Sequence, residues 1–153
     1  MITVFAAYNY PQFLQGIVRD LRALWALEEL GLPYETRWRD TAKGEHRGDD
    51  YRINPFGKIP ALTDGEVSLF ESGAIVNYLF DKAGRAAKTN AERAVNLAWC
   101  FAAVNTVETQ TFDIMIYDTF WKERPNSKQY RAERIENAKL RMNEIDATLG
   151  SKP

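Results

Sequence analysis

Cysteine and histidine are almost absent from this sequence, which has one of each among 153 residues. A single cysteine, Cys100, excludes an internal disulfide framework and favours a reducing compartment. A single histidine, His46, cannot build a metal site, and no other group of metal-ligating residues accompanies it. The sequence therefore predicts no bound metal.

Charge of one sign and long apolar runs are missing as well. Twenty Lys and Arg against 21 Asp and Glu give a net charge of −1, which argues against a general attraction to nucleic acid or to anionic membranes. No apolar run approaches a membrane span, and no basic segment precedes the apolar start from Ile2 to Ala7, which excludes a signal peptide there. We expect a cytoplasmic protein without nucleic-acid or membrane partners.

Residues 54 to 79 carry the strongest local signals in the chain. An apolar run from Ile59 to Leu62 has Pro60 at its second position, which suits a strand start, an edge or a bulge. Asp64 and Gly65 supply the residue types of a tight hairpin turn, and a second run from Val67 to Phe70 follows. The pattern predicts two strands joined by a turn, followed by a helix that Ser72 caps.

The same stretch also predicts a binding surface. If the bond between Ile59 and Pro60 is cis, the chain kinks and turns the N–H and C=O of Ile59 outward, toward an extended peptide ligand. The start of the helix at Ser72 favours a carboxylate through its free N–H groups and its dipole. Glu71 favours a cation beside it. We expect a ligand with an extended peptide backbone, a free carboxylate and a free ammonium.

The first third of the chain reads as strand, helix and strand. The apolar run from Ile2 to Ala7 predicts a central strand, and alternation from Tyr34 to Trp38 predicts a second one. Between them we expect a helix over 17–30, ended by Gly31. A short turn of helix is expected around Asp49 to Ile53. The residues predicted to turn inward from the first helix are Leu21, Leu24, Trp25 and Leu27.

This order, β-α-β and then β-β-α, predicts an α/β thioredoxin-like domain over residues 1–84. A polar linker covers 85–90. One long helix over 91–119, either continuous or broken, and an amphipathic helix over 131–149 then predict an incomplete all-α domain in residues 91–153. The residues expected on the inner face of the last helix are Ile135, Ala138, Met142, Ile145 and Leu149.

Three phrases of the sequence, taken in order, resemble the glutathione-binding half of a glutathione S-transferase. They are Asn-Pro-Phe-Gly-Lys-Ile-Pro-Ala-Leu from residue 54, Asp-Gly from residue 64, and Glu-Ser-Gly-Ala-Ile from residue 71. Ala-Leu-Glu-Glu-Leu-Gly-Leu-Pro-Tyr, from residue 26, is typical of bacterial and theta-like members. The resemblance implies further C-terminal helices, so we expect either a chain truncated at its C-terminus or a shortened member.

The resemblance implies an enzyme that binds glutathione as a cosubstrate, stabilises its thiolate and conjugates it to, or reduces with it, a hydrophobic electrophile. It implies that the backbone of Ile59 pairs with the cysteinyl part and that cis Pro60 supports it. Glu71 and Ser72 would hold the γ-glutamyl ammonium and carboxylate. Lys58 would approach the glycyl carboxylate, or be an exposed turn lysine. A homodimer is also implied.

The residue that activates the thiol stays open. Family members use Tyr, Ser or Cys between the first strand and the first helix, and the Ser or Cys position falls here at Arg19 or Asp20. Arg19 would stabilise a thiolate as a cation, Asp20 fits better as a helix cap, and Tyr8 and Tyr10 offer phenols. The alternative without a catalytic role is that Tyr8 and Tyr10 pack as loop aromatics and that Arg19 is solvated. The missing Ser or Cys also permits a non-catalytic interaction or regulatory module of the same fold.

Overall fold

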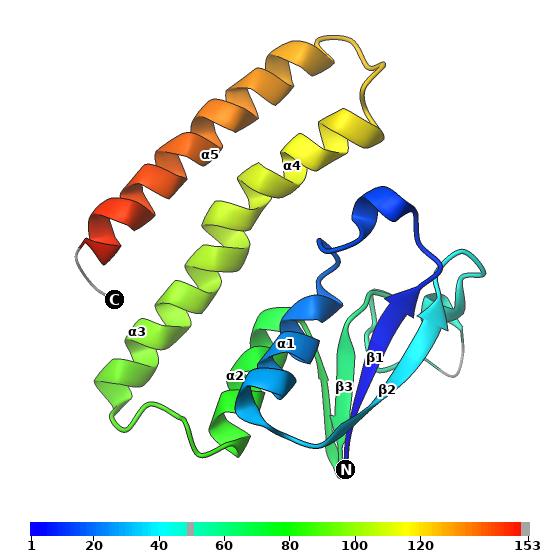
Figure 1. Ribbon diagram of the computed structural model, residues 1–153, viewed down its shortest axis with the longest axis vertical. Helices are drawn as coiled ribbons and strands as arrows, with labels where there is room; N and C mark the ends of the chain where they lie inside the picture. Colours follow the sequence, from blue (N-terminus) through cyan, green and yellow to red (C-terminus); the bar gives the residue numbers. More distant parts are fainter. Residues whose placement is uncertain (49–50, 151–153) are drawn as a thin grey trace. The chain divides into compact units, whose positions relative to one another are not determined.

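The computed structural model describes residues 1–48 and 51–150 and divides the chain into two units, Met1–Asn90 and Ala91–Pro153 (Figure 1). Each unit is considered by itself. The first is a four-stranded sheet with helices α1 and α2, and the second contains helices, with a turn over residues 120–126, and no strand among its described residues. This is the α/β thioredoxin-like arrangement followed by a helical region that the sequence predicts.

The sheet of the first unit has the strand order β2-β1-β3-β4. Strand β1 (Ile2–Tyr8) runs parallel to β2 (Tyr34–Asp40) and antiparallel to β3 (Ala61–Asp64), and β3 runs antiparallel to β4 (Val67–Phe70). The central position of β1 agrees with its continuous apolar run, because a strand with both faces covered needs no polar alternation.

Helices α1 (Asp20–Leu30) and α2 (Ser72–Lys82) pack on one face of this sheet. Their buried contact residues form a single cluster with the strands, and Gly31 ends α1 in a left-handed conformation at φ 62°. Such a backbone angle suits a glycine at a helix C-terminus. The buried members of the cluster are Ile2, Val4, Ala23, Ala26, Leu27, Leu62, Ile75 and Leu79.

Two of the residues expected to face inward from α1 do not. Leu21 is 40% exposed and Trp25 is 69% exposed, whereas Ala23 and Leu27 are fully buried. Residues four apart share a helix face, so Ala23 and Leu27 define the buried side and Leu21 and Trp25 define another. A small alanine lets the helix approach the sheet closely, and the larger apolar residues are left outside.

The turn between β3 and β4 and the N-cap of α2 also differ from the prediction by one residue each. Asp64 pairs with Val67, so the hairpin loop is Gly65-Glu66, and only Gly65 has a positive φ, at 60°. Ser72 is the first residue of α2, preceded by Glu71 at the N-cap position, and no side chain caps this helix. Of the helical turn predicted at 49–53, Asp49 and Asp50 lie outside the described residues, and 51–53 are not helical.

The second face of the sheet is covered by the segment 51–59. Phe5, Tyr51 and Ala61 form a buried cluster there, against which Ile53 and Ile59 pack. The Arg39 guanidinium lies 5.3 Å from the Phe5 ring centroid and 5.7 Å from that of Tyr51. These contacts fix the segment that leads into Pro60.

The second unit contains α3 (Asn90–Phe101), a π-helical stretch η3 (Ala102–Val107), α4 (Glu108–Thr119) and α5 (Ser127–Leu149). The long helix predicted over 91–119 is thus interrupted by η3, and α5 begins four residues before the predicted start at 131. On the predicted inner face of α5, Ala138 is buried, whereas Met142 and Leu149 are exposed.

Charged residues of α5 contribute to the packing of this unit. Arg134 Nε lies 3.2 Å from a carboxylate oxygen of Asp113, and Arg131 pairs with Asp118, so both ion pairs join α5 to α4. Cys100 on α3 is half-buried. None of the helices in residues 1–48 and 51–150 is long and apolar enough to cross a bilayer.

The buried and exposed faces of α1 make a testable contrast. We expect Leu27→Ala to lower the free energy of unfolding by about 2–5 kcal/mol, because it opens a cavity in the buried cluster. Trp25→Ala, at an exposed position, should change it by less than about 1 kcal/mol. Chemical denaturation followed by circular dichroism measures both, and equal losses would contradict the assignment of the two faces.

Candidate functional site

Strand register brings the predicted binding residues to one end of the sheet. Ala61 pairs with Phe70, so the residues that flank this pair, Pro60 and Glu71, lie opposite each other at the same end of the hairpin. Ala61 also pairs with Phe5, and the end of β1 therefore runs past the same place. Helices α1 and α2 both begin here as well. The site is thus assembled from segments far apart in sequence.

Two buried side chains fix the peptide unit that precedes Ile59. The Tyr51 hydroxyl donates to the Lys58 carbonyl oxygen at 2.6 Å, and the Asn54 amide donates to the same oxygen at 3.0 Å. The peptide bond from Lys58 to Ile59 is trans, so its N–H points opposite to its C=O. The N–H of Ile59 is therefore turned away from Tyr51 and Asn54.

Pro60 and Glu71, which lie opposite each other at the end of the hairpin, are both associated with unusual backbone conformations. The bond between Ile59 and Pro60 is cis, as predicted, and Pro60 is buried. Glu71 has φ 69° and ψ 116°, a left-handed φ that non-glycine residues adopt rarely and that is common at functional sites. The Glu71 side chain is exposed, as is that of Lys58.

Ser72 is in contact with the first helix. Its hydroxyl oxygen accepts a hydrogen bond from the Arg22 guanidinium at 3.1 Å, and its side chain is buried, with 4% exposure. Arg22 lies on α1 and is half-buried. A cation and a hydroxyl thus meet at the start of α2, a combination suited to an anion.

Three of the four candidates for thiol activation, Tyr8, Arg19 and Asp20, lie from the last residue of β1 to the first residue of α1 and differ in exposure. Tyr8 ends β1 and is 43% exposed, and Arg19 is an exposed residue that directly precedes α1. Asp20 is buried, and its carboxylate accepts a hydrogen bond from the Ala7 backbone N–H at 2.7 Å. It therefore links the end of the central strand to the start of the helix.

Burial raises the pKa of the Asp20 carboxyl, and hydrogen bonds from the backbone N–H groups of Ala7, Leu21 and Asp20 itself act in the opposite direction. As a carboxylate, Asp20 has no donor for a thiolate, and its negative charge would repel one. The geometry favours the helix-anchoring role that the sequence suggested for this residue.

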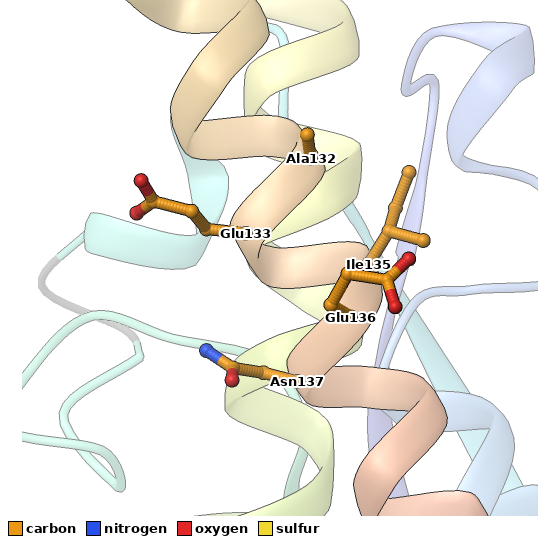
Figure 2. Close-up of a pocket in the computed structure, with 5 residues that line it drawn as sticks. All are labelled: Ala132, Glu133, Ile135, Glu136 and Asn137. Carbon is orange, nitrogen blue, oxygen red and sulfur yellow. The ribbon is translucent and has the colours of Figure 1, made fainter.

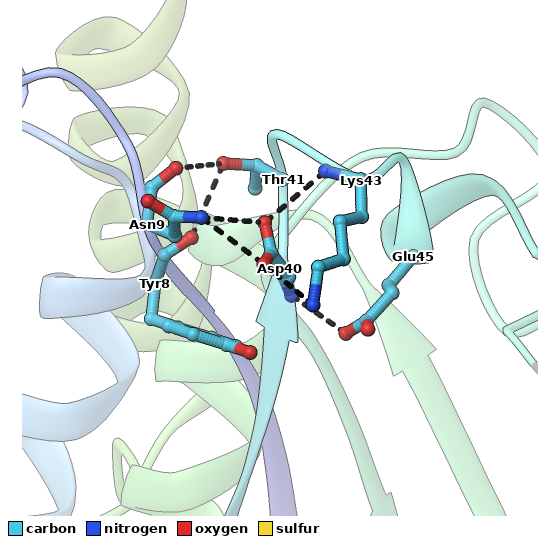
Figure 3. Close-up of polar contacts among 6 residues, drawn as sticks. All are labelled: Tyr8, Asn9, Asp40, Thr41, Lys43 and Glu45. Atoms are coloured by element: carbon cyan, nitrogen blue, oxygen red, sulfur yellow. Dashed lines mark hydrogen bonds and ion pairs between the residues drawn. The ribbon is translucent and has the colours of Figure 1, made fainter.

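A polar cluster at the carboxyl ends of β1 and β2 holds Tyr8 in place (Figure 3). The Asn9 amide nitrogen donates to both carboxylate oxygens of buried Asp40, at 3.1 Å each, and the Lys43 backbone N–H donates to one of them at 3.1 Å. The Thr41 hydroxyl donates to the Tyr8 carbonyl at 3.3 Å. The hydrogen bond from Asn9 is the largest of the effects that hold the pKa of Asp40 below its ordinary value.

Two hollows of the surface lie elsewhere. One, of about 560 Å³, is lined by five residues of α5 alone, and Figure 2 shows that Glu133 and Ile135 leave this helix in different directions. Another, of about 470 Å³, is lined by residues between Arg47 and Gly57. Neither is lined by the predicted ligand contacts, so the binding surface is defined by its backbone and polar groups.

His46, the single histidine, is half-buried in the short helix η2 (Glu45–Arg47), where desolvation and the positive charges of Arg47 and Lys58 lower its pKa. In the part of the chain that the structure describes, no three His, Cys, Asp or Glu side chains are grouped so that they could hold a metal ion.

Sequence reasoning missed four residues of this region: Arg22, Tyr51, Asn54 and Asp40. Arg22 reaches Ser72 from 50 residues away, and no local pattern reports such a contact. Tyr51 and Asn54 act on the carbonyl of Lys58, within seven residues. Asn54 before Pro55 is a local turn signal, which by itself does not indicate a hydrogen bond to the Lys58 carbonyl.

Comparison with known proteins shows what the first unit is similar to. The model of the glutathione S-transferase N-terminal domain matches residues 12–81. Glutathione S-transferase F10 of Arabidopsis thaliana is 48% identical over 62 residues, which are 40% of this chain and 29% of the relative. A glutathione S-transferase of Silene vulgaris is 36% identical over 109 residues, 66% of this chain and 48% of the relative. The matched stretches thus span less than half of these relatives.

A solved structure matches both units. It is the theta class glutathione S-transferase of Xanthomonas axonopodis pv. citri with glutathione bound, with a TM-score of 0.79 and 28% identity, covering 98% of this chain and 70% of that one. The curated relatives named above are plant proteins, so the bacterial and theta-like character that the sequence suggested is not confirmed.

The Asp40 cluster predicts a pH dependence. Because folding lowers the pKa of Asp40, its ionised form stabilises the fold above the unfolded-state pKa of about 3.9, and this contribution is lost as the pH falls through the folded-state value. Asp40→Asn should therefore be less stable than the original chain at pH 7, with the difference shrinking below about pH 4. Urea denaturation at both pH values measures this. Asp146→Asn, at an exposed position of α5, is the control, and a difference that grows on acidification would contradict the prediction.

Proposed function

Because residues 12–81 match the model of the glutathione S-transferase N-terminal domain, we propose that this chain binds glutathione and conjugates it through its thiol to a hydrophobic electrophile, or reduces the electrophile with it. One observation carries the proposal: the outward N–H of Ile59, the carboxylate of Glu71 and the hydroxyl of Ser72 gather at one end of the sheet. These groups match the peptide backbone, the ammonium and the carboxylate of the tripeptide.

Each part of glutathione has a partner in this arrangement. The peptide groups of Ile59 pair with the cysteinyl residue as an added strand would, and Pro60 holds this turn of the chain. Glu71 binds the γ-glutamyl ammonium, and Ser72 donates to the γ-glutamyl carboxylate. Lys58, exposed beside Ile59, lies on the side where the glycyl carboxylate follows.

The cysteinyl sulfur then lies near the end of β1, where Tyr8 and Arg19 are the candidate donors. A phenol hydroxyl donates a hydrogen bond to a thiolate, and a guanidinium adds a fixed positive charge, so both favour the ionised thiol. Asp20 holds the start of α1 in place and thereby helps to position these two donors. The thiolate forms the new bond to the electrophilic carbon while the leaving group departs.

The segment between β1 and α1 also offers an apolar surface for the acceptor. Phe13, Ile17 and Leu21 are 47%, 52% and 40% exposed. Large exposed apolar side chains beside a polar site favour binding of a hydrophobic molecule. We place the acceptor against this segment, with its reacting carbon toward the thiolate.

Calorimetry tests the binding half of the proposal. We expect the chain to bind glutathione in the micromolar to millimolar range, and Ser72→Ala to weaken binding about tenfold or more through the lost charge-assisted hydrogen bond. Ser68→Ala, at an exposed position of β4, is the matched control and should bind like the original chain. Absence of heat with the original chain would refute the proposal.

Conjugation of glutathione to an activated aryl halide tests the chemistry. Tyr8→Phe and Arg19→Met should lower kcat/KM, by roughly tenfold or more for the main donor, and raise the pKa of the bound thiol. Binding without any turnover in the original chain would instead support the non-catalytic module. Unchanged rates in both variants would exclude these two residues as donors.

A further inference from the structure

We propose that Tyr51 is a positioning residue for the ligand: its hydroxyl holds the peptide unit between Lys58 and Ile59 so that the N–H of Ile59 faces a carbonyl group of the bound thiol. The inference rests on the proposed function, which assigns that N–H to the cysteinyl part of glutathione. Tyr51 contacts the carbonyl side of this peptide unit, and the ligand binds to the other side. Tyr51 therefore affects binding through the backbone, without touching the ligand or its sulfur.

The hydrogen bonds of this peptide unit favour one of its two orientations. A carbonyl oxygen has two lone pairs, and that of Lys58 accepts from the Tyr51 hydroxyl at 2.6 Å and from the Asn54 amide at 3.0 Å. The N–H of Ile59 donates to none of the residues that the structure describes. Turning the unit over would leave both donors without this acceptor, although Tyr51 and Asn54 are only 2% and 4% exposed.

The two donors differ in what else they hold. Asn54 also fixes the turn that follows it, because its side-chain oxygen accepts a hydrogen bond from the Phe56 N–H at 2.9 Å. The hydroxyl of Tyr51 has the Lys58 carbonyl as its acceptor and takes no part in that turn. The Tyr51 hydroxyl can therefore be removed without removing a contact of the turn, and its effect on the peptide unit can be measured by itself.

The ring of Tyr51 is placed by the buried cluster on this face of the sheet. Its centroid lies 5.4 Å from that of Phe5, and the Arg39 guanidinium lies 5.7 Å from it. The side chain of Ile59 packs against the same cluster. The peptide unit is thus held at both of its ends, by the hydroxyl at its carbonyl and by this packing at Ile59.

This role makes the effect of Tyr51 depend on a carbonyl group of the ligand. Glutathione has a carbonyl on the carbon that also carries its thiol side chain, and this group can accept a hydrogen bond from the N–H of Ile59. γ-Glutamylcysteamine lacks that carbonyl together with the glycine, and it keeps the thiol and the γ-glutamyl group. Loss of the Tyr51 hydroxyl should weaken binding of the first ligand and not of the second.

Calorimetry and kinetics on Tyr51→Phe test the inference. At pH 7 the variant should bind glutathione about three- to tenfold more weakly, which is the effect of one hydrogen bond. Its affinity for γ-glutamylcysteamine should change by less than about twofold. KM for glutathione should rise by the same factor as the dissociation constant, whereas kcat and the pKa of the bound thiol, measured from the absorbance of the thiolate, should stay unchanged.

Tyr34→Phe is the matched control. It removes a phenol hydroxyl from the other end of the sheet, where Tyr34 pairs with Ile2 and donates to Glu28, and both affinities should stay unchanged. Asn54→Asp removes the second donor to the Lys58 carbonyl and keeps an oxygen for the Phe56 N–H. It should give the same pattern as Tyr51→Phe, with a loss of affinity for glutathione alone.

The outcomes separate the inference from the function on which it rests. If the original chain binds no glutathione, both fail. If the original chain binds glutathione, three results overturn the inference and leave glutathione binding in place: unchanged affinity of Tyr51→Phe, equal weakening for both ligands, or a raised pKa of the bound thiol. Circular dichroism establishes that each variant is folded, and if Tyr51→Phe does not fold, the two affinities of Asn54→Asp decide.

Discussion

The pairing of Ala61 with Phe70 across the β3–β4 hairpin is the constraint on which the proposed site depends. A strand register fixes the neighbours of each pair, and a slip by one residue would turn every side chain of the strand to the other face. In this register Pro60 and Glu71 are opposite each other, and Leu62 faces the buried cluster under the helices. The apolar face of the hairpin thus sets the positions of its polar ends.

The second constraint acts on a single peptide group. The carbonyl of Lys58 receives two buried donors, Tyr51 and Asn54, and burial raises the pKa of Tyr51 to about 12. The phenol therefore stays protonated and remains a donor throughout the neutral range. Because the peptide group is planar, fixing its carbonyl also fixes the N–H of Ile59. The hydrogen bonds from Tyr51 and Asn54 to the Lys58 carbonyl thus control the direction of a neighbouring backbone donor, the N–H of Ile59.

The sequence predicts the elements of the first unit well, because its strands and helices have clear periodicity and clear ends. Pro60, Gly31 and the run from Val67 to Phe70 each specify a local conformation, and the structure has the cis bond, the helix end and the strand that they predict. What the sequence missed depends on contacts between distant segments. It placed Trp25 inside, although Ala23 and Leu27 occupy the face toward the sheet.

Contacts between segments also limit what the sequence predicts for the helical unit. Periodicity describes one helix at a time, and so it places the charged residues of α5 on a face toward solvent. Arg134 and Arg131 instead pair with Asp113 and Asp118 of α4. Both partners of each pair are partly exposed, so these contacts select an alignment of two helices more than they add stability.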